Sequence, residues 1–270
     1  MIYEPTAGAA PPPRAVLLWL PALGVPARKY ARFAQALAAR GFTVGVHEWR
    51  GTGEHPLKAG RGSDWGYREL LQQDIPASAA ALRQRTPDAP LLLGGHSIGG
   101  QFAVLAAALG DEAAGLVAIG SGVPHWRLFP TPLRWLVGGF GMVLPPLVKL
   151  VGAYPGERLG FGGREAARLM RDWAGTVRRG HYDALSGLPD DMSARLGRLD
   201  VPMLGLRHVD DRLVPAASMQ ALLDATGSRA AVHRVLDASD IGVAADHYAW
   251  MRTPGGVAAA VEGWWAEIDA

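Results

Sequence analysis

The chain has 270 residues, of which 49% are hydrophobic and 19% charged, so it can bury the core of one large α/β domain or of a domain with an insertion. Its 27 basic and 25 acidic side chains leave a formal charge of only +2, which gives no reason to expect nucleic acid as a partner. Cysteine is absent, which excludes disulfides, thiolate metal sites and a cysteine nucleophile, and fits a cytoplasmic location.

The N-terminal residues give no sign of a signal peptide, because residues 1–15 lack a basic start and a continuous apolar core. Residues 5–14 resemble a linker rich in proline, alanine and glycine. The longest uncharged apolar run, Trp135 to Val148, has 14 residues with three glycines and two prolines. A membrane-spanning helix needs about 20 residues, so we expect no transmembrane segment.

Strands and helices alternate along the first part of the chain. Apolar runs of strand length, typical of strands buried on both faces, occur at residues 15–20, 42–47, 90–93 and 116–120. Helical patterns occur at residues 30–38, 64–86 and 102–109. The second helix is predicted to be kinked or to restart near Pro76. This alternation predicts a mostly parallel sheet with helices on both faces.

The alternation is interrupted between Val123 and Leu199, where no strand-like run occurs. One clear helix is predicted there, because Leu169, Met170 and Trp173 fall on one helical face. Strands return at residues 201–206 and 231–236, and helices at about 216–226 and 255–268. We therefore predict an α/β core at residues 1–122 and 200–270 and a helical lid insertion at residues 123–199.

The segment Gly95-His96-Ser97-Ile98-Gly99 lies where the strand at residues 90–93 meets the helix at 102–109. A Gly-x-Ser-x-Gly sequence between a strand and a helix is typical of a nucleophile elbow, whose glycines leave room for a strained turn. The serine hydroxyl would then stand near the helix N-terminus, where the Ile98 N–H could hold an oxyanion. The alternative is a glycine-rich turn without chemistry.

A serine hydroxyl needs a base to take its proton and an acid to orient that base, both expected in later loops in the order serine, acid, histidine. The loop after residues 201–206 offers Asp210 and Asp211, and we favour Asp211, four residues before Pro215. Only His247, among eight histidines, lies between the last strand and the last helix. The alternatives are that both aspartates are solvated and that His247 is a surface residue.

The remaining site residues are assigned from their positions. The backbone N–H of Leu23, after the strand at residues 15–20, is predicted as the second oxyanion donor. His96 should point away from the serine hydroxyl, whereas His47 and His208, near strand ends, could line the pocket.

These residues together resemble the α/β-hydrolase superfamily over nearly the whole chain. The matching segments are Pro21-Ala22-Leu23-Gly24, Trp49-Arg50-Gly51-Thr52-Gly53, Gly95-His96-Ser97-Ile98-Gly99-Gly100, Asp211-Arg212-Leu213-Val214-Pro215 and Asp246-His247. The chain more narrowly resembles bacterial hydrolases of the serine-aminopeptidase-like and monoacylglycerol-lipase-like branch. This likeness rests on Gly24-Val25-Pro26, Ser63-Asp64-Trp65 and the segment from His247 to Arg252.

The chain departs from the family pattern at three places. Pro21-Ala22 replaces a usual His-Gly in the oxyanion loop, and Glu48 replaces a usual aspartate before Trp49. The N-terminal lead is too short for the family's first two antiparallel strands, so we expect a trimmed sheet edge.

The resemblance implies a serine hydrolase that cleaves a carboxylic ester through an acyl-enzyme on Ser97 and requires no cofactor and no metal. A serine aminopeptidase, an acyltransferase and a non-catalytic binding protein are the alternatives. The partner expected is a small acyl ester, and the apolar residues 126–152 suit an acyl chain. Lid arginines could attract an anionic substrate or bring the lid into transient contact with a membrane surface, or they could simply be solvated: Arg164, Arg168, Arg171, Arg178 and Arg179.

Overall fold

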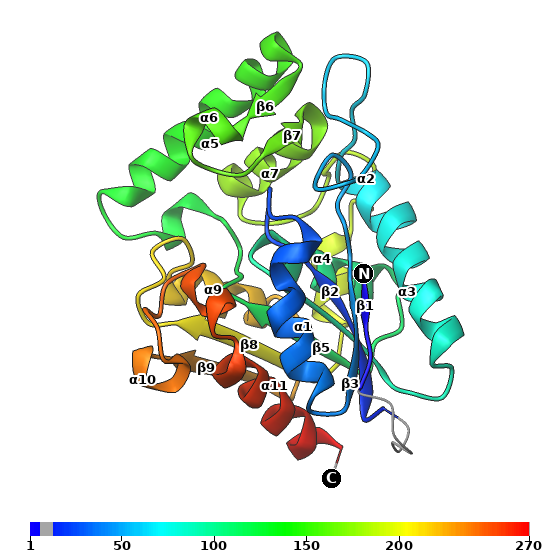
Figure 1. Cartoon of the computed structure of the whole chain (residues 1–270). Coiled ribbons are helices and arrows are strands. Elements are labelled where there is room, and N and C mark those ends of the chain that lie inside the picture. The colour runs from blue at the N-terminus through cyan, green and yellow to red at the C-terminus, as the bar shows by residue number, and fades with distance from the viewer. Residues whose placement is uncertain (6–12, 270) are drawn as a thin grey trace.

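The computed structural model describes residues 1–5 and 13–269, so most of the predicted linker lies outside the described residues. Its main sheet has seven strands in the order β1-β3-β2-β4-β5-β8-β9 (Figure 1). Only β1 is antiparallel to its neighbour, and every other pair is parallel, which confirms the predicted mostly parallel α/β sheet. The strands are β1 (Ile2–Tyr3), β2 (Ala15–Leu20), β3 (Phe42–Val46), β4 (Leu91–His96), β5 (Gly115–Ile119), β8 (Met203–His208) and β9 (Ala231–Leu236).

The sheet edge is short, as the brief N-terminal lead predicts. Among the described residues only the two-residue β1 precedes β2, and it pairs with β3. Strand β2 has β3 on one side and β4, the central strand of the seven, on the other. After β2 the chain crosses to β3 on one side, and after β4 it crosses to β5 on the other side. Where connections from neighbouring strands lead in opposite directions, a crevice forms at the carboxyl ends of those strands, and ligands usually bind there.

Helices cover both faces of the sheet because successive side chains of each buried strand point to opposite sides. Leu17 and Trp19 of β2 pack with α1 (Ala31–Ala38) and α11 (Gly255–Ile268), which lie in front of the sheet in Figure 1. Leu18 and Leu20 face the other side. The helices there are α3 (Ile75–Arg85), α4 (Ile98–Leu109), α8 (Met192–Gly197) and α9 (Ala216–Asp224).

The helix predicted at residues 64–86 changes geometry near Pro76, as expected. It begins as α2 (Tyr67–Glu69), widens into a π-helical turn over residues 70–74 and continues as α3. Pro76 has no backbone N–H to donate, so the preceding turn cannot keep regular α-helical hydrogen bonding.

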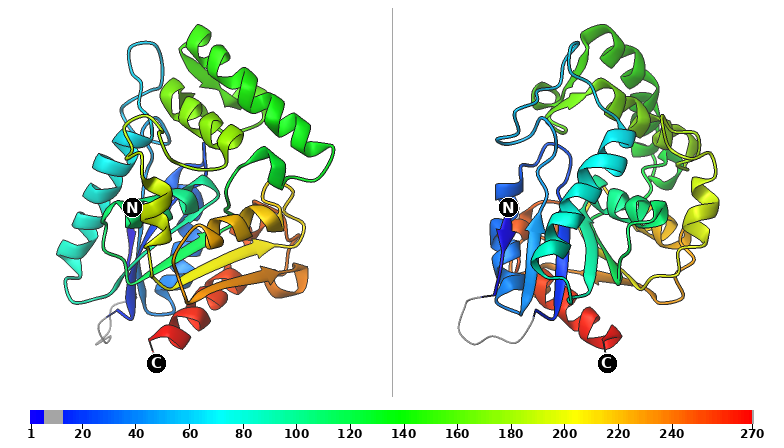
Figure 2. Two further views of the ribbon diagram at one scale, coloured as in Figure 1. Left: turned by 180° about the vertical axis from the view of Figure 1, so that it is seen from behind. Right: turned by 90° about the vertical axis from the view of Figure 1, so that its right-hand side faces the viewer.

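The segment between β5 and β8 contains more regular structure than the sequence predicts. Two short strands, β6 (Ala153–Pro155) and β7 (Arg164–Ala166), pair antiparallel where no strand was expected. They lie with α5 (Leu133–Val151), α6 (Gly156–Leu159) and α7 (Ala167–Arg179) beyond one end of the main sheet (Figures 1 and 2). Residues 182–196 pack instead into the core beside α4. The exact division of the chain at residues 123 and 199 stays a prediction.

The helix α5 was not predicted from the sequence, because glycines and the Pro145-Pro146 pair interrupt its apolar pattern. Pro145 cannot donate to the carbonyl of Gly141, and Arg178 Nη1 of α7 donates to that oxygen instead, at 2.8 Å. At 19 residues, α5 is long and apolar enough to cross a membrane by length and composition alone, although the apolar run was expected to be too short. The expectation of no transmembrane segment stays a prediction.

Candidate active site

Ser97 sits on a sharp turn between β4 and α4, with φ 56° and ψ −122°. Close backbone packing explains the flanking glycines. A Cβ at Gly95 would lie 2.2 Å from the carbonyl carbon of Gly99, and a Cβ at Gly99 would lie 2.0 Å from the Leu20 oxygen. No larger residue fits either position, so the sequence holds the serine in a strained conformation at a helix N-terminus.

Two backbone N–H groups are predicted as oxyanion donors. Ile98 begins α4, so its N–H has no helical acceptor one turn earlier. In the loop after β2, the Ala22 N–H donates to the hydroxyl of Tyr30 at 2.9 Å. Among the described residues nothing accepts a hydrogen bond from the next N–H, that of Leu23. Both predicted oxyanion donors are therefore uncommitted.

His247 and Asp211 form a buried pair from two loops, Asp211 in the loop after β8 and His247 in the segment between α10 (Ala238–Ile241) and α11. His247 Nδ1 donates to Asp211 Oδ2 at 2.7 Å, and the aspartate side chain is fully buried. Its other oxygen accepts the backbone N–H groups of Leu213 and Val214 at 2.8 and 3.0 Å. Asp210, the alternative acid, is exposed and forms no hydrogen bond with the histidine ring among the described residues.

The far side of the His247 ring is free to accept a proton. Because a carboxylate only accepts hydrogen bonds, Nδ1 carries the hydrogen and Nε2 has a lone pair. Nε2 is buried, and none of the described residues, Ser97 included, forms a hydrogen bond with it. Catalytic hydrogen bonds are often long without substrate and tighten when it binds.

A hydrogen-bonded chain joins the oxyanion loop to the turn that carries the serine. Tyr30 OH accepts the Ala22 N–H and donates to His96 Nδ1 at 2.8 Å. Complete burial, together with the neighbouring His247 and His208, holds the pKa of His96 well below its usual range, so the ring is neutral and can accept this hydrogen bond. Tyr30 was not predicted as a site residue, because in the sequence it is one of several apolar residues at helical spacing.

The departures from the family pattern are compensated by local contacts. The carbonyl of Pro21 accepts Trp49 Nε1–H at 2.9 Å, which fixes the start of the oxyanion loop. Glu48 Oε1 accepts the N–H of Ala27 at 3.1 Å and so ties the loop after β3 to the same region.

Neither of the other two strand-end histidines borders the large cavity beside His247. His208 is fully buried and stacks on Trp250, with ring centres 5.8 Å apart. His47 is bonded to Ser78 Oγ at 2.9 Å. Burial lowers the pKa of each to about 4, so both are neutral at pH 7. Among the described residues no cluster of three or more histidine, aspartate or glutamate side chains could hold a metal ion.

Residues 11–238 match the family described as "Serine aminopeptidase, S33". The chain belongs to this family, within the α/β-hydrolase superfamily. No curated protein sequence matches it.

Several hydrolases of known structure share the fold of this chain. A monoacylglycerol lipase from Paleococcus ferrophilus is 16% identical, with a TM-score of 0.64 over 99% of this chain and 98% of that one. A monoglyceride lipase from Saccharomyces cerevisiae is 14% identical, with a TM-score of 0.69 over 99% and 90%. A thermophilic esterase from Thermogutta terrifontis is 17% identical, with a TM-score of 0.63 over 100% and 94%. At these identities the likeness concerns the fold.

Proposed function

We propose that this hydrolase cleaves carboxylic esters through an acyl-enzyme on Ser97. The observation that carries the proposal is the strained serine, followed directly by the uncommitted N–H of Ile98, on a sheet whose later loops supply the buried Asp211–His247 pair. Neutral ester carbonyls suit such a site, since its donors stabilise the negative charge that develops on the carbonyl oxygen.

The steps follow from the residues. Ser97 Oγ forms a bond to the ester carbonyl carbon while its proton passes to His247 Nε2. The N–H groups of Ile98 and Leu23 hold the oxyanion, and Asp211 stabilises the imidazolium. The leaving oxygen takes the proton as its bond to carbon breaks. His247 Nε2 then takes a proton from water as the water oxygen bonds to the acyl carbon. It returns that proton to Ser97 Oγ as the bond between Oγ and the acyl carbon breaks, and the acid product leaves.

The test is covalent labelling with a fluorophosphonate probe and location of the adduct by mass spectrometry. We expect one adduct, on Ser97, lost in Ser97→Ala and retained in Ser186→Ala, a matched change of an exposed serine. Turnover of 4-nitrophenyl esters should disappear in the same variant. A folded Ser97→Ala protein that still turns over esters would refute the assignment of the nucleophile, and an unlabelled wild type would favour a non-catalytic binding protein.

Aminopeptidase activity is the second candidate, favoured by a buried acid of the lid. Glu165 of β7 is 5% exposed, and burial raises its pKa to about 7. It accepts the N–H of Gly163, whose loop packs against Gly24 in the oxyanion loop. A carboxylate there could pair with a substrate ammonium. Hydrolysis of alanine 4-nitroanilide at a rate comparable with ester hydrolysis, and lost in Glu165→Gln, would favour this candidate.

An acyltransferase would use the same serine and acyl-enzyme but pass the acyl group to an alcohol or amine. Product analysis in the presence of glycerol separates the two outcomes, because only transfer yields a new ester.

A further inference from the structure

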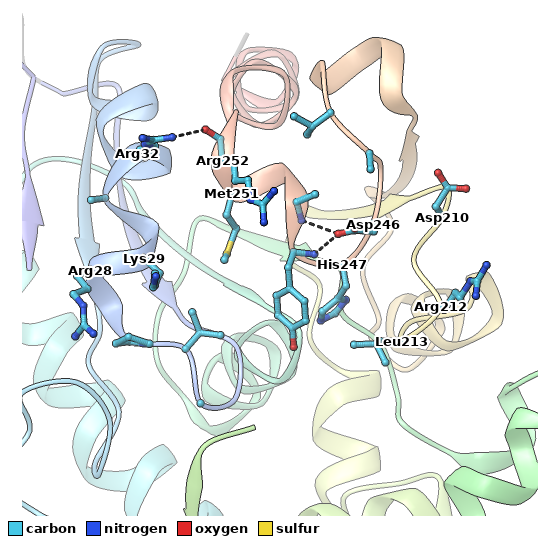
Figure 3. Close-up of a pocket in the computed structure, with 18 residues that line it drawn as sticks. Arg28, Lys29, Arg32, Asp210, Arg212, Leu213, Asp246, His247, Met251 and Arg252 are labelled. Carbon is cyan, nitrogen blue, oxygen red and sulfur yellow. Dashed lines mark hydrogen bonds between the residues drawn. The ribbon is translucent and has the colours of Figure 1, made fainter. Parts of the chain in front are cut away.

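A large open cavity lies beside the proposed catalytic histidine. Its volume is about 1340 Å³, and it is bordered by His247 and Tyr248 on one side and by Gly24 of the oxyanion loop on another. Figure 3 shows it between the helical segment that carries Arg28, Lys29 and Arg32 and the loop that carries Asp210 and Arg212. His247 borders the cavity and Ser97 does not, so a substrate held between these two residues could extend past the histidine ring into it.

The lining of this cavity is strongly basic. Five basic side chains border it and two acidic ones, Asp210 and Asp246. The basic residues are Arg28, Lys29, Arg32, Arg212 and Arg252. Asp246 is directed to backbone, accepting the N–H groups of Tyr248 and Ala249 at 2.9 and 2.7 Å, as Figure 3 shows.

These cations have no ionic partners within the described residues. None of the five forms a salt bridge there, and the only hydrogen bond from their side chains is that of Arg32 Nη1 to the Arg252 carbonyl, at 3.1 Å. Isolated cations are usual on a surface, but five around one concavity create a positive potential that attracts anions.

The lid arginines, which the sequence analysis offered as an anion site, differ in this respect. Arg168 pairs with Asp64 and Glu69, with the shorter contact at 2.9 Å. Arg164 and Arg178 donate to backbone carbonyls, each at 2.8 Å. Arg171 Nη2 lies 4.0 Å from Asp64 Oδ2, and only Arg179 has no partner among the described residues. Four of these five arginines are therefore engaged in contacts of the lid, whereas none of the five cations of the cavity has an ionic partner.

We propose that this cavity binds an anionic oxygen group, a carboxylate or a phosphate, carried by the ester substrate. The inference rests on the proposed function and narrows its substrate class. Guanidinium groups are well suited to such anions because their N–H groups match two oxygens at once. The same charges repel the free ammonium that an aminopeptidase substrate presents, so the cavity also favours ester over peptide hydrolysis in this family member.

The kinetic test compares two esters with the same bond and acyl length. Mono-4-nitrophenyl glutarate carries a carboxylate, and 4-nitrophenyl pentanoate does not. We expect the kcat/KM ratio of the charged to the neutral ester to fall about fivefold in Arg28→Gln and in Arg252→Gln, changes on separate walls of the cavity, because a charge-assisted contact is lost. The ratio should also fall in 0.5 M NaCl, which screens these charges.

Arg158→Gln is the matched control. Arg158 of α6 is exposed, does not border the cavity and forms no salt bridge among the described residues, so its loss should leave the ratio unchanged. An unchanged ratio in both cavity variants for this ester pair and for the pair described next, or the same fall in the control, would overturn the proposal. A second ester pair with the carboxylate on the leaving group, 4-butyryloxybenzoate against phenyl butyrate, covers the other substrate orientation, and the proposal needs only one pair to respond.

Binding can be measured without turnover. In Ser97→Ala, saturation-transfer NMR should detect monomethyl glutarate more strongly than dimethyl glutarate, and Arg28→Gln should remove the difference. Displacement by inorganic phosphate would show that phosphate groups are also accepted, and displacement only by acetate would restrict the site to carboxylates. Equal signals from both esters would overturn the cavity assignment. Anion binding by a wild type without ester turnover would refute the proposed function alone.

Discussion

The helices α4 and α5 are both rich in apolar residues, but the fold uses them in opposite ways. Ten of the twelve residues of α4 are buried, whereas only three of the nineteen residues of α5 are. The first lies between the sheet and other helices, so all of its faces meet protein. The second packs along one face on α7 and leaves other apolar side chains exposed, among them Trp135, Leu136, Met142, Val143 and Leu150.

This difference indicates that close packing around α4 positions the residues of the proposed active site. In α4, small residues let backbone approach backbone, and the position of the Ser97 turn relative to the oxyanion loop depends on those contacts. In α5, Gly139 has open space where a Cβ would lie. Changes in the first helix should therefore affect both stability and chemistry, whereas equivalent changes in the second should have small effects.

The largest effect is expected for Gly99→Ala. Its new Cβ would meet the backbone oxygens of Leu20 and Pro21, at 2.0 and 2.7 Å, so the loop that carries Leu23 must move. A displacement of about 1 Å in a catalytic group lowers kcat by roughly 100-fold. The measurement is the rate of fluorophosphonate labelling, with circular dichroism to follow folding. Wild-type labelling in a folded variant would show that the close approach does not position the site.

The next effect comes from removing the same side chain from each helix. Leu105 of α4 is fully buried, so Leu105→Ala should lower the free energy of unfolding by about 3 kcal/mol through lost burial and a cavity. Leu136 of α5 is 69% exposed, so Leu136→Ala should change the free energy of unfolding by less than about 0.5 kcal/mol. Urea unfolding measures both values. Comparable losses would mean that α5 is covered in solution, for example by a second copy of the chain.

The comparison also explains which parts of the structure the sequence could predict. Strand β2 has the bounds expected from its apolar run, because a strand buried on both faces of a parallel sheet needs little beyond such a run. The edge strand β9 also has its expected bounds, although none of its residues is fully buried. The helix α5 was not predicted, because Pro145 and Pro146 normally end a helix and the compensating donor, Arg178, lies on another element. Contacts between distant segments leave no local pattern.

The candidate site also contains some residues that the sequence could predict and others that it could not. Ser97 could be found from its glycines, and Asp211 and His247 from their places after later strands, although their catalytic roles stay predictions. The Tyr30–His96 hydrogen bond and the ring of cations around Arg28 could not be found, since each depends on which loops meet above the sheet.

A change of pH should have an intermediate effect on the free energy of unfolding, and this effect should come from a buried group of the core. The pKa of His208 falls from its ordinary value near 6.5 to about 4, mainly through burial. The unfolded chain therefore binds a proton that the folded chain does not between these values, and stability is lost as pH falls from about 6.5 towards 4. This group should lower the free energy of unfolding by about 2 kcal/mol between pH 7 and pH 5.

Urea unfolding of His208→Phe at the two pH values tests this. Both ring nitrogens of His208 lack hydrogen bonds among the described residues, so phenylalanine loses none and can keep the stacking on Trp250. The variant should therefore depend less on pH than the wild type. An identical pH dependence would assign the acid sensitivity to other buried groups, such as His47. The helix α5 holds no histidine, aspartate or glutamate, so none of this effect should arise there.

The smallest effect should have the opposite sign. Gly139→Ala adds a methyl group to α5 where nothing lies within 4 Å, and alanine favours the helical backbone by about 0.5–1 kcal/mol over glycine. We expect a higher midpoint in thermal unfolding and an unchanged labelling rate at Ser97. Gly141→Ala, two residues further on, is the matched comparison, because its Cβ would lie 2.7 Å from Val177 Cγ1 of α7. If both variants were more stable than the wild type, α5 would have to shift on α7 more freely than its packing indicates. If both were less stable, the face of α5 at Gly139 would have to be covered.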